Sequence, residues 1–131
     1  MTTNVLFLCP HGAAKSTSSV AFLRREAQQR GLDLRVSNGG TEPDAEVNPI
    51  VAERLDADGL GYEEPRHVTQ ADLDAADMII NFGCERADLA TTTPIHEWRV
   101  PNFSEDAAAA FLAIEAHVSG LATGLEAAGG G

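Results

Sequence analysis

The sequence has 131 residues, of which 44% are hydrophobic, and its formal net charge is -11. A chain of this length can bury one core and is too short for two. The excess of acidic residues repels polyanions, so nucleic acids and anionic membrane surfaces are poor partners for the protein. A small anion can still be bound by a local site.

Neither the start of the chain nor its hydropathy indicates export or a membrane span. We expect no apolar run close to the ~20 residues that a transmembrane helix needs. The first four residues lead directly into an apolar stretch and not into a basic signal region. We therefore expect a cytoplasmic protein that contacts no membrane.

The first third of the chain predicts strand, loop, helix and strand. Residues 5–8 form an apolar run typical of a buried strand, and residues 16–30 have apolar residues at helical spacing until Gly31 ends the pattern. Residues 32–36 alternate apolar and polar as a half-buried strand does, and Gly39 and Gly40 end it.

The rest of the chain continues the alternation of helices and strands. Asn48 and Pro49 suit the start of a helix, and Thr69 suits the cap of another. The expected elements are helices over residues 49–59, 69–76 and 104–125, and strands over residues 78–82 and 95–100.

Strands that alternate with helices imply a mostly parallel sheet covered on both faces. The sequence therefore predicts a single three-layer α/β domain. We assign residues 1–125 to this domain and residues 126–131, which end in three glycines, to a flexible tail.

The loop of residues 9–16 joins the first predicted strand to the first predicted helix. Such a loop presents backbone N–H groups and the positive end of the helix dipole to a bound anion. Gly12 can adopt backbone angles that other residues avoid, and the small side chains of Ala13 and Ala14 leave the N–H groups accessible. We predict oxyanion binding by Pro10, His11, Gly12, Ala13, Ala14 and Lys15.

Cys9, at the start of this loop, has the surroundings of a reactive cysteine. Helix N-termini and nearby cations favour the thiolate, which is the nucleophilic form. Lys15 can place a charge beside an oxyanion, and Ser16 can cap the helix or donate a hydrogen bond to the thiolate. We predict Cys9 as the nucleophile, assisted by Lys15 and Ser16. The alternative is a small buried cysteine in a loop that merely connects two elements.

Residues 5–16, V-L-F-L-C-P-H-G-A-A-K-S, resemble the Cys-x5-Arg-Ser/Thr loop of the low-molecular-weight protein tyrosine phosphatase superfamily. Residues 38–49, N-G-G-T-E-P-D-A-E-V-N-P, resemble the S-A-G-T-x-P…V-N-P stretch of its arsenate reductase branch. Residues 79–84, I-I-N-F-G-C, are similar to that branch's strand ending in Met-Gly-Cys. The resemblance covers residues 4 to about 125. It implies a flavodoxin-like sheet of four parallel strands, with the oxyanion at the C-terminal end of the first.

Two departures from the family pattern concern catalysis. The loop arginine is Lys15 here, which keeps the charge but loses the planar fork that grips two phosphoryl oxygens. Where the family has an Asp-Pro general acid, this sequence has Asn102, which cannot protonate a leaving group. Losing a general acid typically lowers a rate by ~10²–10⁴. Glu105 or Asp106 can substitute only if the acid loop is repositioned.

Three other positions bear on the resemblance. Gly12 stands where the family has a loop asparagine, which predicts a less rigid loop, and we interpret His11 as a structural hydrogen-bonding group. The family's thioredoxin-coupled reductases use a relay of three cysteines, but this sequence has only Cys84 besides Cys9. Cys84 is either a buried structural thiol or a second thiol that attacks a Cys9 adduct. A mechanism with an external low-molecular-weight thiol does not need it.

The resemblance implies two activities and leaves a third interpretation open. Cys9 attacks arsenate in the first and a phosphoryl group of an aryl or phosphotyrosine ester in the second. The missing acid harms hydrolysis of an ester with a poor leaving group more, which favours the arsenate reductase interpretation. The third is a catalytically impaired regulatory protein that binds phosphate or a similar oxyanion.

The expected ligands and partners follow from these interpretations. We expect no metal, since the four histidines share no ligand spacing with the cysteines. We also expect no cofactor, apart from an external thiol as reductant. The expected partners are a phosphate-, arsenate- or sulfate-like anion and either a phosphoprotein or a thiol carrier.

Overall fold

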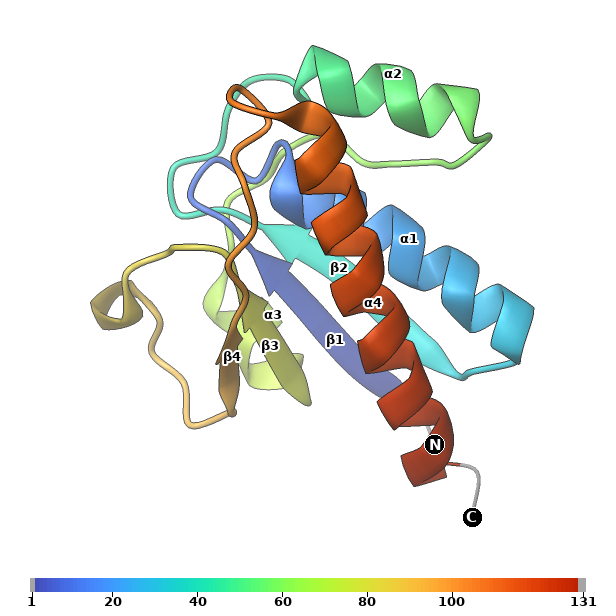
Figure 1. Ribbon diagram of the computed structural model, residues 1–131. Coiled ribbons are helices and arrows are strands. Elements are labelled where there is room, and N and C mark those ends of the chain that lie inside the picture. Colours follow the sequence, from blue (N-terminus) through green and yellow to red (C-terminus); the bar gives the residue numbers. More distant parts are fainter. Residues whose placement is uncertain (1, 130–131) are drawn as a thin grey trace.

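The computed structural model describes residues 2–129, which form a sheet with helices on both faces (Figure 1). The four strands have the order β2-β1-β3-β4, and every pairing is parallel. The predicted three-layer α/β fold is therefore confirmed. The elements are β1 (Thr3–Leu8), α1 (Lys15–Arg30), β2 (Leu34–Gly39), α2 (Pro49–Ala57), α3 (Gln70–Ala75), β3 (Met78–Asn81), the 3-10 turn η1 (Arg86–Asp88), β4 (Ile95–Glu97) and α4 (Ala107–Gly129).

The last helix differs most from the expected boundaries. It begins at Ala107 and not at residue 104, and it continues to Gly129. Residues 126–129 therefore belong to α4 and not to the flexible tail that we expected, since alanine and glutamate there favour helix. Residues 130–131, the end of that expected tail, lie outside the described part of the chain.

The alternation of side chains along β1 divides the core into two clusters. Val5 and Phe7 face α1 and α4, whereas Leu6 and Leu8 face α3. All four side chains are 2% exposed or less. A strand buried on both faces has no polar side, which explains the continuous apolar run in its sequence. The two faces of the sheet are thus separate chemical environments.

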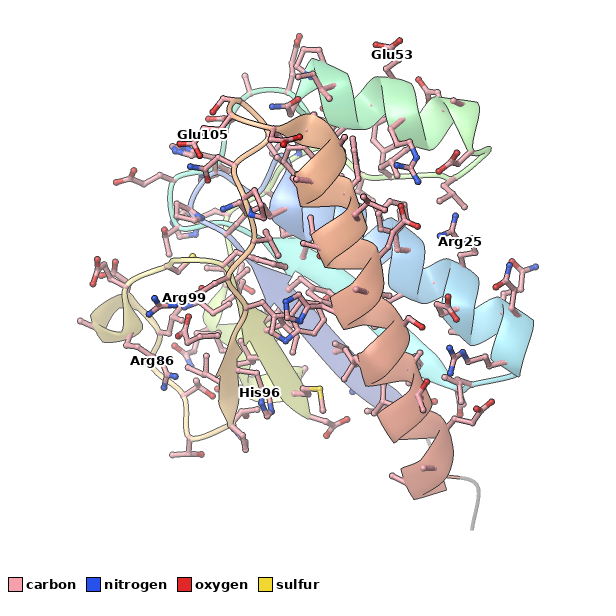
Figure 2. All side chains as sticks on the ribbon, viewed as in Figure 1. Arg25, Glu53, Arg86, His96, Arg99 and Glu105 are labelled. Carbon is pink, nitrogen blue, oxygen red and sulfur yellow. The ribbon has the colours of Figure 1, made fainter. Side chains whose placement is uncertain are left out.

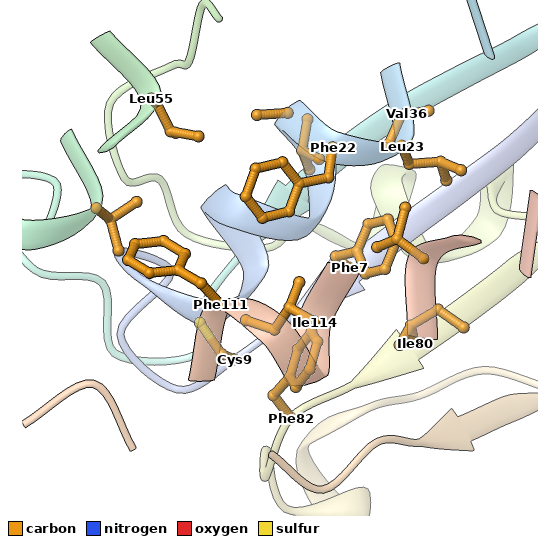
Figure 3. Packing of buried hydrophobic residues seen from close by; sticks show 14 of the residues in the cluster. Phe7, Cys9, Phe22, Leu23, Val36, Leu55, Ile80, Phe82, Phe111 and Ile114 are labelled. Carbon is orange, nitrogen blue, oxygen red and sulfur yellow. The ribbon is translucent and has the colours of Figure 1, made fainter. Parts of the chain in front are cut away.

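The cluster beneath α1 and α4 is rich in aromatic side chains (Figure 3). Phe111 of α4 packs edge-on against Phe22 of α1, with ring centroids 6.4 Å apart, and against Phe103 at 4.8 Å. Cys9 belongs to this cluster, where β1 ends. The thiol therefore lies between an apolar core and the loop that follows it.

The composition of α4 corrects one expectation from the sequence. The helix has 23 residues and a mean hydropathy of 1.4 in its most apolar window, so by length and composition alone it could cross a membrane. One side of it packs against α1 and the aromatic cluster. Core packing accounts for the apolar residues on this side only, since 28% of that window is buried; the buried residues are Ala110, Phe111, Ile114, Val118 and Ala122.

The cap of α3 allows a test of stability at a distance from the loop of residues 9–16. The Asp72 N–H donates to the Thr69 hydroxyl at 3.1 Å, and the Thr69 N–H donates to the Asp72 carboxylate at 2.8 Å. We expect Thr69→Ala to lower the free energy of unfolding by ~1 kcal/mol in urea denaturation. Phosphate binding should not change. Wild-type stability in this variant would show that the cap contributes nothing in solution.

Candidate active site

A pocket of about 360 Å³ opens between the β1–α1 loop and the segment that leads into α4. Cys9 lines it and is 5% exposed. The loop contributes Cys9, Pro10, His11, Ala13, Ala14 and Lys15, and the other lining residues are Asp44, Asn48, Phe82, Asn102, Phe103 and Ser104. The volume is ample for a tetrahedral oxyanion.

The carbonyl groups of the loop are held away from the pocket. They accept hydrogen bonds from backbone N–H groups of residues 42–48, at 2.7 Å to Pro10, 2.9 Å to His11 and 2.9 Å to Ala13. The described chain has no cis peptide bond. In a trans peptide the C=O and the following N–H point in opposite directions. The Pro10 and Ala13 carbonyls, fixed on the outside of the loop, therefore turn the N–H groups of His11 and Ala14 inward.

The backbone N–H groups of the loop are largely unpaired in the described part of the chain. Among residues 2–129, none of the backbone N–H groups of His11, Ala13, Ala14, Lys15 and Ser16 donates a hydrogen bond. Backbone N–H groups in folded proteins are nearly always paired. A set of unpaired ones beside the N-terminus of α1 is what a bound oxyanion satisfies.

We call this set of unpaired N–H groups the cradle. Two residues of the predicted oxyanion loop contribute no N–H group to it. Pro10 has no N–H, and the Gly12 N–H donates to the Cys9 carbonyl at 3.1 Å. Gly12 has a φ of +61°, which glycine adopts readily. Both residues therefore shape the loop, and neither offers a backbone N–H to an oxyanion, although Pro10 lines the pocket.

Ser16 lies directly beside the thiol, as the sequence predicted. Its Oγ is 3.1 Å from the Cys9 Sγ, and its side chain is fully buried. A thiolate has no proton, so in that form the hydroxyl of Ser16 donates to the sulfur. A hydrogen bond to a charged acceptor is stronger than a neutral one, so the contact stabilises the thiolate.

Lys15 lies at the mouth of the pocket and is held by Asn102. The Lys15 Nζ donates to the Asn102 Oδ1 at 2.9 Å. An amide oxygen orients the ammonium group without neutralising it. The cation therefore remains available to an oxyanion in the pocket.

The comparisons with known proteins place this site in a family. The model for the family described as low molecular weight phosphotyrosine protein phosphatase matches residues 4–123. The chain belongs to this family. It is 32% identical over 102 residues to a Halobacterium salinarum protein named "Putative arsenate reductase", covering 74% of this chain and 72% of that protein. The resemblance inferred from the sequence is confirmed, and the chain is an arsenate reductase-like member of the superfamily.

Solved structures give the same result. The arsenate reductase from Archaeoglobus fulgidus is 28% identical to this chain, with a TM-score of 0.78 over 91% of this chain and 98% of that one. A low molecular weight phosphotyrosine phosphatase from Vibrio cholerae shares the fold, with a TM-score of 0.82 at 20% identity over 97% and 99% of the two chains. Both branches of the superfamily therefore have this architecture.

The two carboxyl groups predicted as replacements for the family's general acid do not line the pocket. Asp106 accepts a hydrogen bond from the Ala109 N–H at 3.0 Å, so it caps the start of α4. Glu105 is 3.5 Å from the Asn102 Nδ2, on the segment that leads into α4 (Figure 2). The prediction that either residue acts as the acid is therefore not supported by the geometry.

Asp44 is a site residue that the sequence analysis missed. Among the described residues that line the pocket, it alone carries a carboxyl group. Its Oδ1 lies 3.3 Å from the His11 Nδ1, which is also 3.2 Å from the Glu42 carbonyl oxygen. His11 thus fastens the loop to the adjacent segment, as its structural interpretation predicted. No feature of the sequence besides its place in the 38–49 stretch pointed to Asp44.

Cys84 lies on the opposite face of the sheet from Cys9. The two thiols are free and buried in different core clusters. Burial raises the pKa of the Cys84 thiol; a hydrogen bond from the Thr41 hydroxyl at 3.9 Å opposes this, and a negative charge on Cys9 adds to it. Asn81 fixes the turn at Cys84 by accepting from its N–H at 2.9 Å. These features favour the structural interpretation of Cys84.

Proposed function

We propose that this protein reduces arsenate, with Cys9 as the nucleophile and an external low-molecular-weight thiol as the reductant. The main support is the set of acceptor-free N–H groups beside the Cys9 thiol. Together with Lys15 they stabilise negative charge on a small tetrahedral anion. The names of the Halobacterium and Archaeoglobus relatives support arsenate as that anion.

The proposed reaction has three steps. The Cys9 thiolate attacks arsenic(V), forming a sulfur–arsenic bond, and one arsenate oxygen leaves as water after protonation. An external thiolate then attacks the Cys9 sulfur. The sulfur–arsenic bond breaks, its electron pair leaves with arsenite as arsenic(III), and Cys9 remains in a mixed disulfide. A second external thiol displaces Cys9 by disulfide exchange, so two thiols are oxidised for each arsenate reduced.

The leaving group favours arsenate over an ester. Asn102, at the position of the family's acid, has no proton to give to an alkoxide. Arsenate loses only a hydroxide or water, which needs less help from a general acid. The reductant and the reduced state of Cys9 both require a reducing compartment, so we also propose a cytoplasmic location with a thiol carrier as partner.

Whether turnover needs Cys84 distinguishes a mechanism with an external thiol reductant from one in which Cys84 is the second thiol. We expect Cys84→Ser to retain arsenate-dependent oxidation of a small thiol within about twofold of wild type. The reason is that Cys84 lies on the other face of the sheet and its raised pKa keeps it protonated near neutral pH. The assay measures thiol loss with and without arsenate. Loss of turnover in this variant would show that Cys84 is the second nucleophile.

The pH dependence gives an independent check on Cys84. Below its raised pKa, the thiolate fraction of Cys84 increases ~tenfold per pH unit. A Cys9–Cys84 disulfide, if it forms, should therefore form faster as the pH rises from 6 to 8. An external thiol reductant predicts no such disulfide at any pH in this range.

A weak phosphatase is the second candidate function, and Asp44 is the observation that favours it. Its carboxyl group lines the pocket and is more than half exposed, so it has access to a leaving group there. If Asp44 is the acid, Asp44→Asn should lower hydrolysis of an aryl phosphate without changing arsenate reduction.

Asn102→Asp tests what limits phosphatase activity. It restores a carboxyl group at the family's acid position, within reach of Lys15. We expect hydrolysis of phenyl phosphate, whose leaving group needs a proton, to increase by ~10²-fold. Unchanged hydrolysis would show that a factor other than the missing acid limits this reaction.

A further inference from the structure

We propose that Asn38, in β2, is a positioning residue that directs the Ser16 hydroxyl toward the Cys9 sulfur. This inference deepens the proposed function and rests on Cys9 being the reactive thiol. Asn38 is 8% exposed and pairs with Phe7 of β1. Its side chain therefore reaches the loop from the neighbouring strand, not from within the loop itself.

The amide of Asn38 contacts three groups around the thiol. Its Nδ2 lies 3.2 Å from the Ser16 Oγ, 3.4 Å from the Gly12 carbonyl oxygen and 3.4 Å from the Thr17 Oγ1. Asn38 and the three residues that it contacts are all buried. Water therefore competes little for these hydrogen bonds, and the direction of each one matters.

Only one orientation of the Asn38 amide fits the donors and acceptors around it. The Gly12 carbonyl can only accept, so the amide nitrogen of Asn38 must face it. The Thr17 hydroxyl donates its own proton to the same carbonyl at 3.1 Å, which leaves its oxygen to accept from Asn38. The amide has two protons for three acceptors, so the two contacts at 3.4 Å share one of them.

The same orientation is consistent with the direction of the Ser16 proton. Ser16 accepts from Asn38 and has one proton of its own, and the Cys9 sulfur lies 3.1 Å from its oxygen. When Cys9 is a thiolate, its sulfur can only accept, so the Ser16 proton points to it, and the hydrogen bond from Asn38 holds the Ser16 oxygen in that position. A chain of hydrogen bonds thus runs from the Asn38 amide through the Ser16 hydroxyl to the Cys9 thiolate, which it stabilises.

Asn38 also holds the backbone of the loop, which has no asparagine of its own. Gly12 stands where the family has a loop asparagine, and the sequence alone predicted a less rigid loop for this reason. In the structure, the amide of Asn38 and the hydroxyl of Thr17 both hold the Gly12 carbonyl. Because the Ala13 N–H belongs to the same peptide, this contact keeps it directed into the pocket.

The test is the alkylation rate of Cys9 by iodoacetamide, followed by peptide mass spectrometry over a range of pH. Only the thiolate reacts. We expect Asn38→Ala to lower the rate ~3–10-fold at pH 6.5, from the loss of part of a hydrogen bond to a charged acceptor. Ser16→Ala should lower it at least as much. The double variant should lose less than the two single losses combined, because Asn38 acts mainly through Ser16.

Ser37→Ala is the matched control, since Ser37 is the neighbouring residue of β2 and points to the other face. It should alkylate at the wild-type rate. Additive losses in the double variant, or a wild-type rate in Asn38→Ala, would overturn the proposal. If Asn38→Ala does not fold, Asn38→Leu keeps a similar volume with no donor and no charge, and a wild-type rate in that variant would also overturn the proposal. Alkylation needs no arsenate, so a failed reductase assay does not affect this result.

Discussion

Replacing Cys9 with serine is expected to abolish arsenate-dependent thiol oxidation and to leave phosphate binding intact. A serine hydroxyl is a far weaker nucleophile, and it cannot form the mixed disulfide that releases arsenite. Loss of a nucleophile that acts with its neighbours lowers turnover by about 10⁴–10⁶-fold. Turnover is measured by thiol oxidation, and phosphate affinity by isothermal titration calorimetry.

Phosphate binding in Cys9→Ser is the internal control. The N–H groups that form the cradle belong to the backbone, so the substitution does not remove them. Removal of the thiolate charge should leave phosphate affinity equal to or higher than that of wild type. Arsenate reduction that survives in the variant would contradict the proposed role of Cys9. Equal phosphate affinity together with no turnover in the wild type would favour the oxyanion-binding protein instead.

Gly40→Ala is expected to damage the site without touching a reactive group. A Cβ at this position would lie 2.7 Å from the Pro10 carbonyl oxygen, 2.9 Å from the Cys9 carbonyl oxygen and 2.9 Å from the Gly12 nitrogen. All three atoms are backbone, so the loop itself must move. Inserting an atom into a packed site costs ~1–3 kcal/mol of stability. Misplacing catalytic groups by about 1 Å lowers a rate by ~10²-fold.

Gly61→Ala is the matched control for this substitution. A Cβ there meets no atom within 4 Å, so stability and turnover should both equal those of wild type. Urea denaturation and thiol oxidation measure the two effects separately. Wild-type turnover in Gly40→Ala would show that the loop tolerates displacement. The protein's activity would then not depend on the fixed positions of the loop N–H groups.

The features that were predictable from the sequence depend on local patterns. The apolar run that ends at Cys9 identified a strand buried on both faces, and the small residues after it identified the loop. Asn48 and Thr69 were recognised as caps because capping acts within three residues of the helix start. The end of α4 was set too early, since nothing in its Ala-rich sequence marks a stop before the last glycines.

The features that were missed depend on contacts between distant segments. Asn38 reaches the loop across β2, and Gly40 leaves room for the loop carbonyls. Asp44 lines the pocket because its segment is hydrogen-bonded to the loop. Spacing along the chain does not show which way a carbonyl points. For that reason the sequence could not show that Pro10 and Gly12 offer no N–H group to the pocket.

The most direct test of the central claim is the state of both thiols after arsenate is added. The reduced protein is incubated with arsenate, with and without one equivalent of a small thiol, then quenched and analysed by intact and peptide mass spectrometry. We predict a mixed disulfide at Cys9 only when both reagents are present, with Cys84 reduced throughout. No change at Cys9, in protein that still binds arsenate, would contradict the proposal that this cysteine transfers electrons to arsenic.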